Sequence, residues 1–249
     1  MAENGFKEVV LTGIHLSSYG TDTGDSLLHL IEEVHNIEGI KRIRLGSLEP
    51  RLITEEFAQQ ISRLPKLCPH FHLSLQSGCD DTLVRMNRKY SADEYARGCE
   101  ILRKYYEHPA ITTDVIVGFP GETDEEFEIT KKFLERIHFY EMHIFKYSKR
   151  QGTRAAIMPN QIPEEIKTKR SNILIEQGET MSGEFRDYYI DSVQEVLFEE
   201  KNNINGQEYF VGYTKEYVKV AVKTEENLEN VLKEGKIIGR LINDVYEMR

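Results

Sequence analysis

The first 150 residues alternate between short apolar runs and longer amphipathic stretches. The runs are apolar on consecutive positions, as in Val115-Ile116-Val117, which is typical of strands buried on both faces of a parallel sheet. The pattern predicts strands at residues 8–12, 42–46, 72–76, 113–118 and 141–147.

Helix start signals precede the amphipathic stretches between these strands. Ser91 with Glu94 and Thr123 with Glu126 have the spacing of capping boxes. Thr54 and Asp25 are the expected caps of two further helices. Repeated strand–helix alternation predicts right-handed βαβ units, in an open sheet or a barrel, and we favour a complete or partial barrel.

The pattern changes after Met158-Pro159. Pro163 is expected to begin a long polar helix that runs to about Tyr188. From Asp191 onward, short β-branched runs separated by Asn and Gly turns predict a small β-barrel or sandwich. Its predicted strands are residues 193–198, 208–213, 218–223 and 237–245. The sequence therefore predicts an α/β domain at 1–183, including a linker helix at its end, and a small all-β domain at 184–249.

Composition narrows the function classes. The formal net charge of −10 over 249 residues argues against wholesale wrapping of nucleic acid. No apolar run is long enough to cross a membrane, and we expect no membrane partner. Cys68, Cys79 and Cys99 fit neither a disulfide framework nor a CxxC metal knuckle, which favours a reducing cytoplasm. They offer no obvious ligand set for an iron–sulfur cluster.

In a parallel α/β barrel, reactive groups gather where strands end and the following loops begin. These positions carry polar, small or aromatic side chains rather than a cluster of acids, which favours a small polar organic ligand over a bare divalent metal. Asp114, Ile116 and Gly118 share one strand face, although the turn after them also fits an ordinary strand-to-helix connection. The positions are Thr12, Gly13, His15, Ser47, Glu49, Gln76, Ser77, residues 112–122, Phe145 and Tyr147.

The histidines leave a metal site open as an alternative. His70 and His72 could offer two ligands on one face, and Glu49, Asp114 and His143 lie on other strands. However, His70 and His72 enter their strand from its N-terminal side, which usually serves stability. We therefore predict no metal ligands, and keep a metal-dependent barrel hydrolase as the less favoured alternative.

Taken together, the motifs resemble the radical S-adenosylmethionine (SAM) tRNA methylthiotransferases. The residues that carry the resemblance are VVLTGIHLSSYG (9–20), RIRLGSLEP (42–50), HLSLQSGCDDTLVRMNRKY (72–90), TDVIVGFPGET (113–123) and IFKYSKRQGTRA (144–155). The segments VLFEE (196–200) and GYTKEYVKVAV (212–222) resemble the family's TRAM domain, a small OB-like β-barrel used for RNA. Within the family, the sequence segments LTGIHLSSYG and SLEP resemble the branch of enzymes that act on threonylcarbamoyladenosine.

The resemblance implies a partial radical-SAM-type (β/α) barrel followed by a TRAM barrel. It implies SAM cleavage by a [4Fe–4S] cluster and methylthiolation at C2 of N6-threonylcarbamoyladenosine, beside the anticodon of tRNA. The partner would be the anticodon stem-loop. By the same resemblance, the SAM-contacting residues are Thr12, Gly13, Ser47, Gln76, Ser77, Asp114, Ile116, Gly118, Phe119, Phe145 and Tyr147.

The chain also departs from the family pattern. The CxxxCxxC motif that holds the SAM-cleaving cluster normally precedes LTGIHLSSYG, and it is absent from these 249 residues. We therefore expect a C-terminal fragment that lacks the cluster-binding first βα unit, contains no catalytic residue of its own and is inactive alone. The alternative is a catalytically dead tRNA-binding module. Residues 184–249 carry nine basic and fourteen acidic side chains, so RNA binding there would depend on shape and local contacts.

Overall fold

The computed structural model describes residues 1–13 and 15–249, and Ile14, inside the LTGIHLSSYG motif, lies outside the described residues. The described part of the α/β region contains five strands, and the strands that pair do so in parallel. The first sheet holds β1 (Glu8–Leu11) and β2 (Arg42–Leu45), and the second β3 (His70–His72), β4 (Ala110–Val117) and β5 (Glu141–Lys146). Isolated bridges from Ile43 to Leu67 and from Leu48 to Leu73 connect the two sheets into one open, curved wall.

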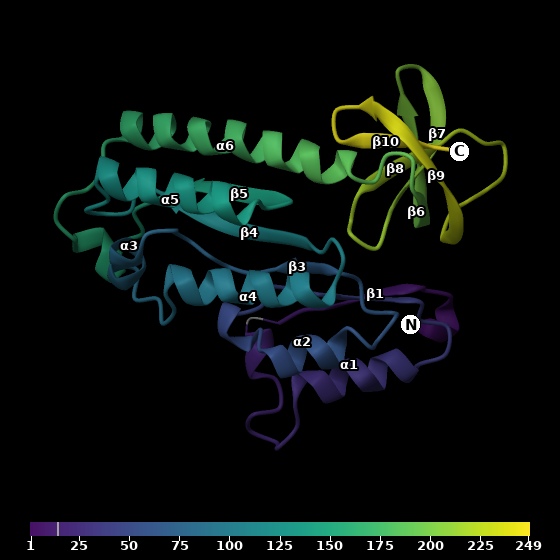
Figure 1. Cartoon of the computed structure of the whole chain (residues 1–249), viewed down its shortest axis with the longest axis horizontal. Helices are drawn as coiled ribbons and strands as arrows, with labels where there is room; N and C mark the ends of the chain where they lie inside the picture. Colours follow the sequence, from purple (N-terminus) through teal and green to yellow (C-terminus); the bar gives the residue numbers. More distant parts are fainter. Residues whose placement is uncertain (14) are drawn as a thin grey trace.

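Helices cover one face of this wall (Figure 1). A single apolar cluster joins that face to five of the helices; its strand members include Ile43, Phe71 and Val115. The helices are α1 (Leu27–Asn36), α2 (Glu55–Ile61), α3 (Asp80–Arg85), α4 (Ala92–Tyr105), α5 (Asp124–Ile137) and α6 (Glu164–Asp187). Short 3-10 turns occupy Ala2–Asn4, Leu16–Ser18, Pro50–Leu52 and Arg154–Ile157. The face turned away from α1, α2, α4 and α5 is called the inner face below.

Most predicted helix starts are confirmed. Ser91 and Thr123 both form complete capping boxes, at the starts of α4 and α5. Thr54 caps α2 as predicted. The Asp25 prediction is wrong by one residue: Ser26 is the N-cap of α1 and accepts from the His29 N–H, while Asp25 accepts from the Ser26 N–H. The short helix α3 is not among the predicted elements.

Two predicted strands need correction. Residues 72–76 were expected to form one strand, but β3 ends at His72, and Leu73 and Gln76 form only isolated bridges. Gln76 has a φ of 72°, a left-handed conformation that no strand residue adopts. Residues 237–245 were also expected to form one strand; a turn at Asn243, whose φ is 46°, instead separates β9 (Val231–Ile242) from β10 (Val245–Met248).

The C-terminal strands form a closed barrel of five strands in the order β10-β8-β7-β6-β9. β7 (Gln207–Tyr213) and β8 (Lys219–Val222) match the predicted positions, whereas β6 (Val193–Ile204) begins as predicted but continues six residues beyond the predicted end at 198. Helix α6 lies along β5 and leads from the wall to this barrel (Figure 1).

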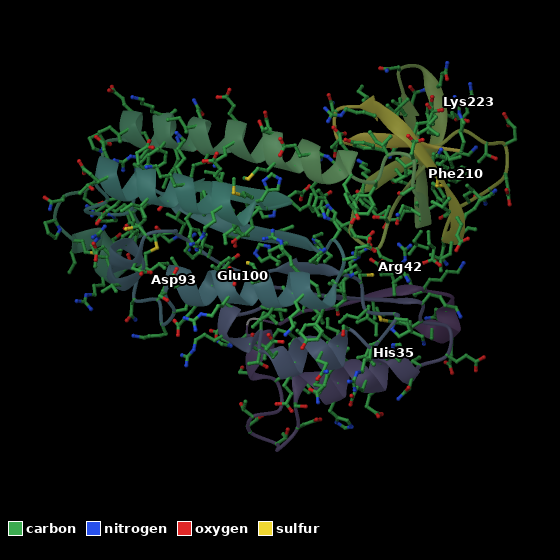
Figure 2. All side chains as sticks on the ribbon, viewed as in Figure 1. His35, Arg42, Asp93, Glu100, Phe210 and Lys223 are labelled. Carbon is green, nitrogen blue, oxygen red and sulfur yellow. The ribbon has the colours of Figure 1, made fainter. Side chains whose placement is uncertain are left out.

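The small barrel is docked on the inner face at the N-terminal ends of the parallel strands. Arg42, labelled in Figure 2, is fully buried and donates to the Tyr213 and Glu195 carbonyls at 2.7 and 2.6 Å. Arg44 donates to the Lys215 and Thr214 carbonyls at 2.8 and 2.9 Å. These contacts cover the end of the inner face where β2 begins.

Candidate ligand-binding wall

Strand register gathers the chemistry-bearing side chains on the inner face. Asp114 of β4 is paired with His143 of β5, and Ile116 is paired with Phe145. Because paired residues of parallel strands point to the same side, these four side chains form a continuous surface. The sequence prediction that Asp114 and Ile116 share a face is therefore consistent with the register.

The apolar part of this surface is open. Phe145 is 53% exposed although it is a large aromatic side chain in a strand. Next to it, the Tyr147 ring packs edge-on against Phe119 at 5.2 Å between centroids. The Tyr147 hydroxyl is buried and has no hydrogen-bond partner among the described residues. An exposed apolar surface beside an unpartnered hydroxyl suits a planar ligand that carries a hydrogen-bonding group.

A glycine turn follows β4 and is held in place by α6. Gly118 has a φ of 71°, and a Cβ there would lie 2.1 Å from the Lys167 Cγ. The Gly118 N–H donates to Glu122 at 3.0 Å, and Glu122 forms a buried pair with Arg170 at 2.5 Å. Burial raises the pKa of Glu122 above its ordinary value, while the Gly118 N–H and Arg170 act in the opposite direction. The turn is therefore fixed by a charged pair rather than left mobile.

The polar positions at the ends of β1 and β2 are exposed. Thr12 and Gly13 follow β1, and Ser47 follows β2. A cavity of about 190 Å³ opens beside Ser47. Its lining includes His15 and Glu49, which are 3.0 Å apart.

Gln76 and Ser77 occupy different environments. The Gln76 backbone bonds on both sides of Val115, donating to the Asp114 carbonyl and accepting from the Ile116 N–H. The side chain of Ser77 is 1% exposed and lies 3.1 Å from the Thr130 hydroxyl of α5. Ser77 is therefore bonded on the helix side of the wall, apart from the other predicted site residues.

Three titratable side chains of the inner face lie close together. Ligand-type atoms of His72, Asp114 and His143 are all within 4.8 Å of one another. The hydrogen bond with His72 holds the pKa of Asp114 below its ordinary value. His70 and Glu49, the other members of the metal alternative considered above, lie elsewhere: His70 stacks on Tyr217 at 5.0 Å and Glu49 pairs with His15.

The cysteines do not form a cluster site. Cys68, Cys79 and Cys99 are all free and buried, and no close set of potential ligands among the described residues contains two of them. Burial raises the pKa of Cys68 to about 11 and of Cys99 to about 12, which disfavours the thiolate that iron requires. The cysteines of this chain therefore do not fit a [4Fe–4S] cluster.

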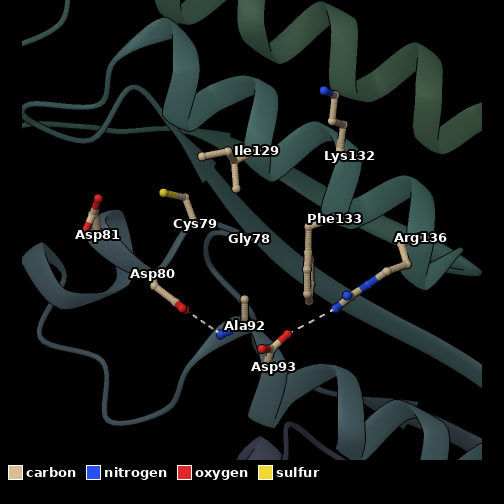
Figure 3. Close-up of a pocket in the computed structure, with 10 residues that line it drawn as sticks. All are labelled: Gly78, Cys79, Asp80, Asp81, Ala92, Asp93, Ile129, Lys132, Phe133 and Arg136. Atoms are coloured by element: carbon tan, nitrogen blue, oxygen red, sulfur yellow. Dashed lines mark hydrogen bonds and ion pairs between the residues drawn. The ribbon is translucent and has the colours of Figure 1, made fainter.

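A separate cavity of about 460 Å³ lies between α3, α4 and α5 (Figure 3). Part of its polar lining is already paired: Asp80 accepts from the Ala92 N–H at 2.7 Å, and Asp93 lies 3.7 Å from Arg136. None of the predicted ligand-contacting residues lines this cavity. The wall described above, and not this cavity, is the candidate site.

The residues that cover one end of the inner face, Arg42 and Arg44, were not predicted from the sequence. Arg42 and Arg44 alternate with Ile43 and Leu45, and this period of two was a readable signal that the arginines lie opposite the helices. The partner of these arginines, the loop around Tyr217, is more than 170 residues away and no local pattern pointed to it.

Comparisons with known proteins agree with this architecture. Residues 1–134 match the sequence profile of the Radical SAM superfamily. The chain is 40% identical over 241 residues to the threonylcarbamoyladenosine tRNA methylthiotransferase MtaB of Bacillus subtilis, covering 96% of the chain and 53% of that protein. It is 37% identical over 245 residues to the tRNA-2-methylthio-N(6)-dimethylallyladenosine synthase of Acetivibrio thermocellus, covering 98% of the chain and 49% of that protein.

Among solved structures, the coproporphyrinogen III oxidase of Escherichia coli, a radical SAM enzyme, has a similar fold. The TM-score is 0.55 at 17% identity, over 71% of this chain and 41% of that one. The chain thus spans about half the length of the curated relatives it matches. No helix in the described residues is both long and apolar enough to cross a membrane.

Proposed function

This chain belongs to the radical SAM superfamily, and we propose on that premise that it is part of a tRNA methylthiotransferase. The observation that carries the proposal is the similarity to the Bacillus subtilis enzyme, which runs through the parallel strands and the small barrel alike. The reaction of the whole protein would be methylthiolation at C2 of N6-threonylcarbamoyladenosine beside the anticodon, in the cytoplasm. The partners would be SAM and the anticodon stem-loop of tRNA.

Radical SAM proteins use SAM and a [4Fe–4S] cluster, which together supply the radical that activates a C–H bond of the substrate. The residues of the wall fit SAM. Ile116 and Phe145 would cover one side of the adenine and exclude water there, and the Tyr147 hydroxyl would gain the partner it lacks. Phe119 would support the Tyr147 ring, and Gly118 would let the backbone approach the ligand.

The polar groups would hold the rest of SAM. Thr12, Gly13 and Ser47 are exposed at the strand ends and would face the methionine part. Gln76 would face its polar groups, and Asp114 would line the adenosine. Ser77 is the weakest member of the set, because its hydroxyl is already bonded to α5.

We propose that the chain alone does not cleave SAM, because its own cysteines do not fit the cluster. Cluster ligands would have to come from outside these 249 residues. We expect anaerobic reconstitution of the purified chain with iron and sulfide to yield no 5′-deoxyadenosine from SAM under reducing conditions. Formation of that product in proportion to protein would contradict this part of the proposal.

We propose that residues 1–183 act as a partial radical SAM barrel and residues 184–249 as a TRAM-like RNA-binding module. The change in secondary structure supports this division, because the helix α6 ends at Asp187 and the first strand of the small barrel, β6, begins at Val193. The net charge of −5 over residues 184–249 favours recognition of tRNA shape over general attraction to phosphate. Binding to an anticodon stem-loop RNA should then exceed binding to an unstructured RNA of equal length.

Equilibrium dialysis with SAM tests the proposed wall. We expect Phe145→Ala to weaken SAM binding about tenfold, because stacking on a base is worth roughly 1–3 kcal/mol. The matched control is Ile129→Ala, which removes a similarly exposed apolar side chain from α5 on the other side of the wall. Equal loss in both variants, or none in Phe145→Ala, would contradict the proposed site. Stem-loop binding without any SAM binding would favour the tRNA-binding module instead.

A further inference from the structure

Three side chains on adjacent strands of the inner face form a set in which only Asp114 belongs to the proposed SAM contacts. His72 belongs to β3, Asp114 to β4 and His143 to β5. The His72 Nε2 lies 3.4 Å from the Asp114 Oδ2, and the two imidazole rings lie 5.9 Å apart between centroids. Two imidazoles and one carboxylate thus converge from three neighbouring strands.

The spacing is close to that of a coordination site. Zinc bonds to nitrogen and oxygen at about 2.0–2.2 Å, so neighbouring ligands of a tetrahedral ion lie about 3.4 Å apart. The ligand-type atoms of the three residues are within 4.8 Å of one another. The His143 side chain is exposed on the edge strand β5, so it can rotate to shorten its distances. The two members beside it are more enclosed: His72 is 15% exposed and Asp114 29%.

One histidine is already oriented as metal ligands usually are. The His72 Nδ1 lies 2.9 Å from the Thr112 hydroxyl, while its Nε2 points to Asp114. A metal-ligating histidine almost always uses its other ring nitrogen in such a hydrogen bond, which fixes the orientation of the ring. Thr112 is buried.

The negative charge of Asp114 favours a cation as the species that binds to these three residues. Asp114 offers a carboxylate, whose Oδ2 lies 3.4 Å from the His72 Nε2. An anionic ligand would face that charge, whereas a divalent cation would be neutralised by it. Imidazole and carboxylate together favour first-row transition ions such as zinc, cobalt or iron(II) over calcium or magnesium.

An approach path is also present. A cavity of about 600 Å³ lies between β5, α6 and the β9–β10 turn, and His143 is part of its lining. Glu141 and Asp244 line the same cavity. Arg186 and Arg240 line it as well, so the cavity is an opening of mixed charge beside His143.

We propose that His72, Asp114 and His143 form a mononuclear site for a divalent first-row transition ion, with positions open to water or to a ligand oxygen. The site contains no cysteine. Its existence does not depend on the proposed methylthiotransferase function, because the ion would bind to this chain in the absence of SAM and tRNA.

The test uses the untagged chain after removal of metals with a chelator. Titration with Co²⁺, followed by its visible ligand-field absorption, and with Zn²⁺, followed by calorimetry, should give one equivalent bound. His143→Ala should weaken binding at least about 100-fold, since removing a ligand costs more than removing an orienting partner. Thr112→Val keeps all three ligands and removes the hydrogen bond to His72, so it should weaken binding about 10–100-fold.

The matched control is His29→Ala. His29 is an exposed histidine that lies near two acids, 2.8 Å from Asp25 and 3.8 Å from Glu33, but belongs to no convergent set. Its loss should leave the Co²⁺ spectrum and affinity unchanged. Circular dichroism and melting temperature establish that each variant is folded. Binding that survives His143→Ala in a folded variant, or that is lost in His29→Ala, would overturn the proposal.

Discussion

At the scale of single residues, Gly118 is the position where backbone conformation most directly shapes the wall. Its φ of 71° disfavours any side chain, and a Cβ would meet Lys167, itself bonded to the Tyr147 carbonyl at 3.1 Å. Gly24 has a φ of 78° but nothing within 4 Å of a Cβ. A comparison of substitutions at the two glycines therefore distinguishes the cost of backbone strain from the cost of a steric clash.

We expect Gly24→Ala to lower the free energy of unfolding by about 1 kcal/mol, from conformational strain alone. Gly118→Ala should cost about 2–3 kcal/mol, because Lys167 must also move away from the turn. Urea denaturation of both variants measures the difference. Equal losses would mean that Lys167 yields without cost and that α6 does not constrain the turn.

We expect the buried His70 side chain to make the free energy of unfolding depend on pH. Burial lowers its pKa to about 3, from an ordinary value of 6.5. Between these two values the unfolded chain binds a proton that the folded chain does not, so the free energy of unfolding should fall as the pH falls from about 6.5. The slope from this one group approaches about 1.4 kcal/mol per pH unit.

His70→Phe removes the titrating group and keeps an aromatic ring to stack on Tyr217. The pH dependence of its unfolding free energy should therefore be shallower than that of the original chain below pH 6.5. Urea midpoints measured from pH 7 to pH 4 make the comparison. Parallel curves for the two proteins would show that His70 becomes protonated within the folded structure.

At the scale of elements, α6 is attached to the glycine turn through Arg170. This side chain is buried and bonds to Glu122 at 2.5 Å and to the exposed Asp124 at 2.8 Å. Removal of Arg170 would leave Glu122 as a buried charge without its partner, a change that typically costs about 3–5 kcal/mol. Asp124 is solvated and contributes little.

We therefore expect Arg170→Met to lower the free energy of unfolding by about 3–5 kcal/mol, and Asp124→Asn to lower it by less than about 1 kcal/mol. The double variant Arg170→Met with Glu122→Gln should recover much of the loss, because no buried charge then remains. Chemical denaturation of the four proteins gives the comparison. Failure of the double variant to recover would indicate that Arg170 acts through packing on Phe127 instead.

Some features of the helices and strands could be predicted from the sequence, and others could not. Capping boxes at Ser91 and Thr123 were readable because the interacting groups are three residues apart. The end of β3 could not be predicted from the sequence. The alternation of apolar residues continues through Leu75, although the backbone becomes left-handed at Gln76. The candidate wall was largely predictable from strand ends. The set of His72, Asp114 and His143 was named but not assembled, since its geometry depends on strand register.

At the scale of the whole molecule, the small barrel and the parallel wall form one structure through buried arginine–carbonyl bonds. Arg42 donates to Tyr213 and Glu195 and is fully buried, while its neighbour Lys41 is exposed. Arg44 adds two more bonds and its guanidinium lies 4.7 Å from the Tyr217 ring centroid. Both units should therefore unfold together, and the apolar core of the small barrel also includes Ala110 and Tyr140 of the α/β region.

Replacement of Arg42 tests this coupling. Arg42→Leu leaves the Tyr213 and Glu195 carbonyls buried without their donor, at a cost of about 1–3 kcal/mol for each unsatisfied group. Because that loss falls on the interface and on neither core, calorimetry should show the single transition split into two, with the small barrel melting separately. Lys41→Leu changes the adjacent exposed residue and should leave one transition. A single transition at an unchanged temperature in Arg42→Leu would mean that packing of Tyr217 and His70, rather than the arginine bonds, holds the two units together.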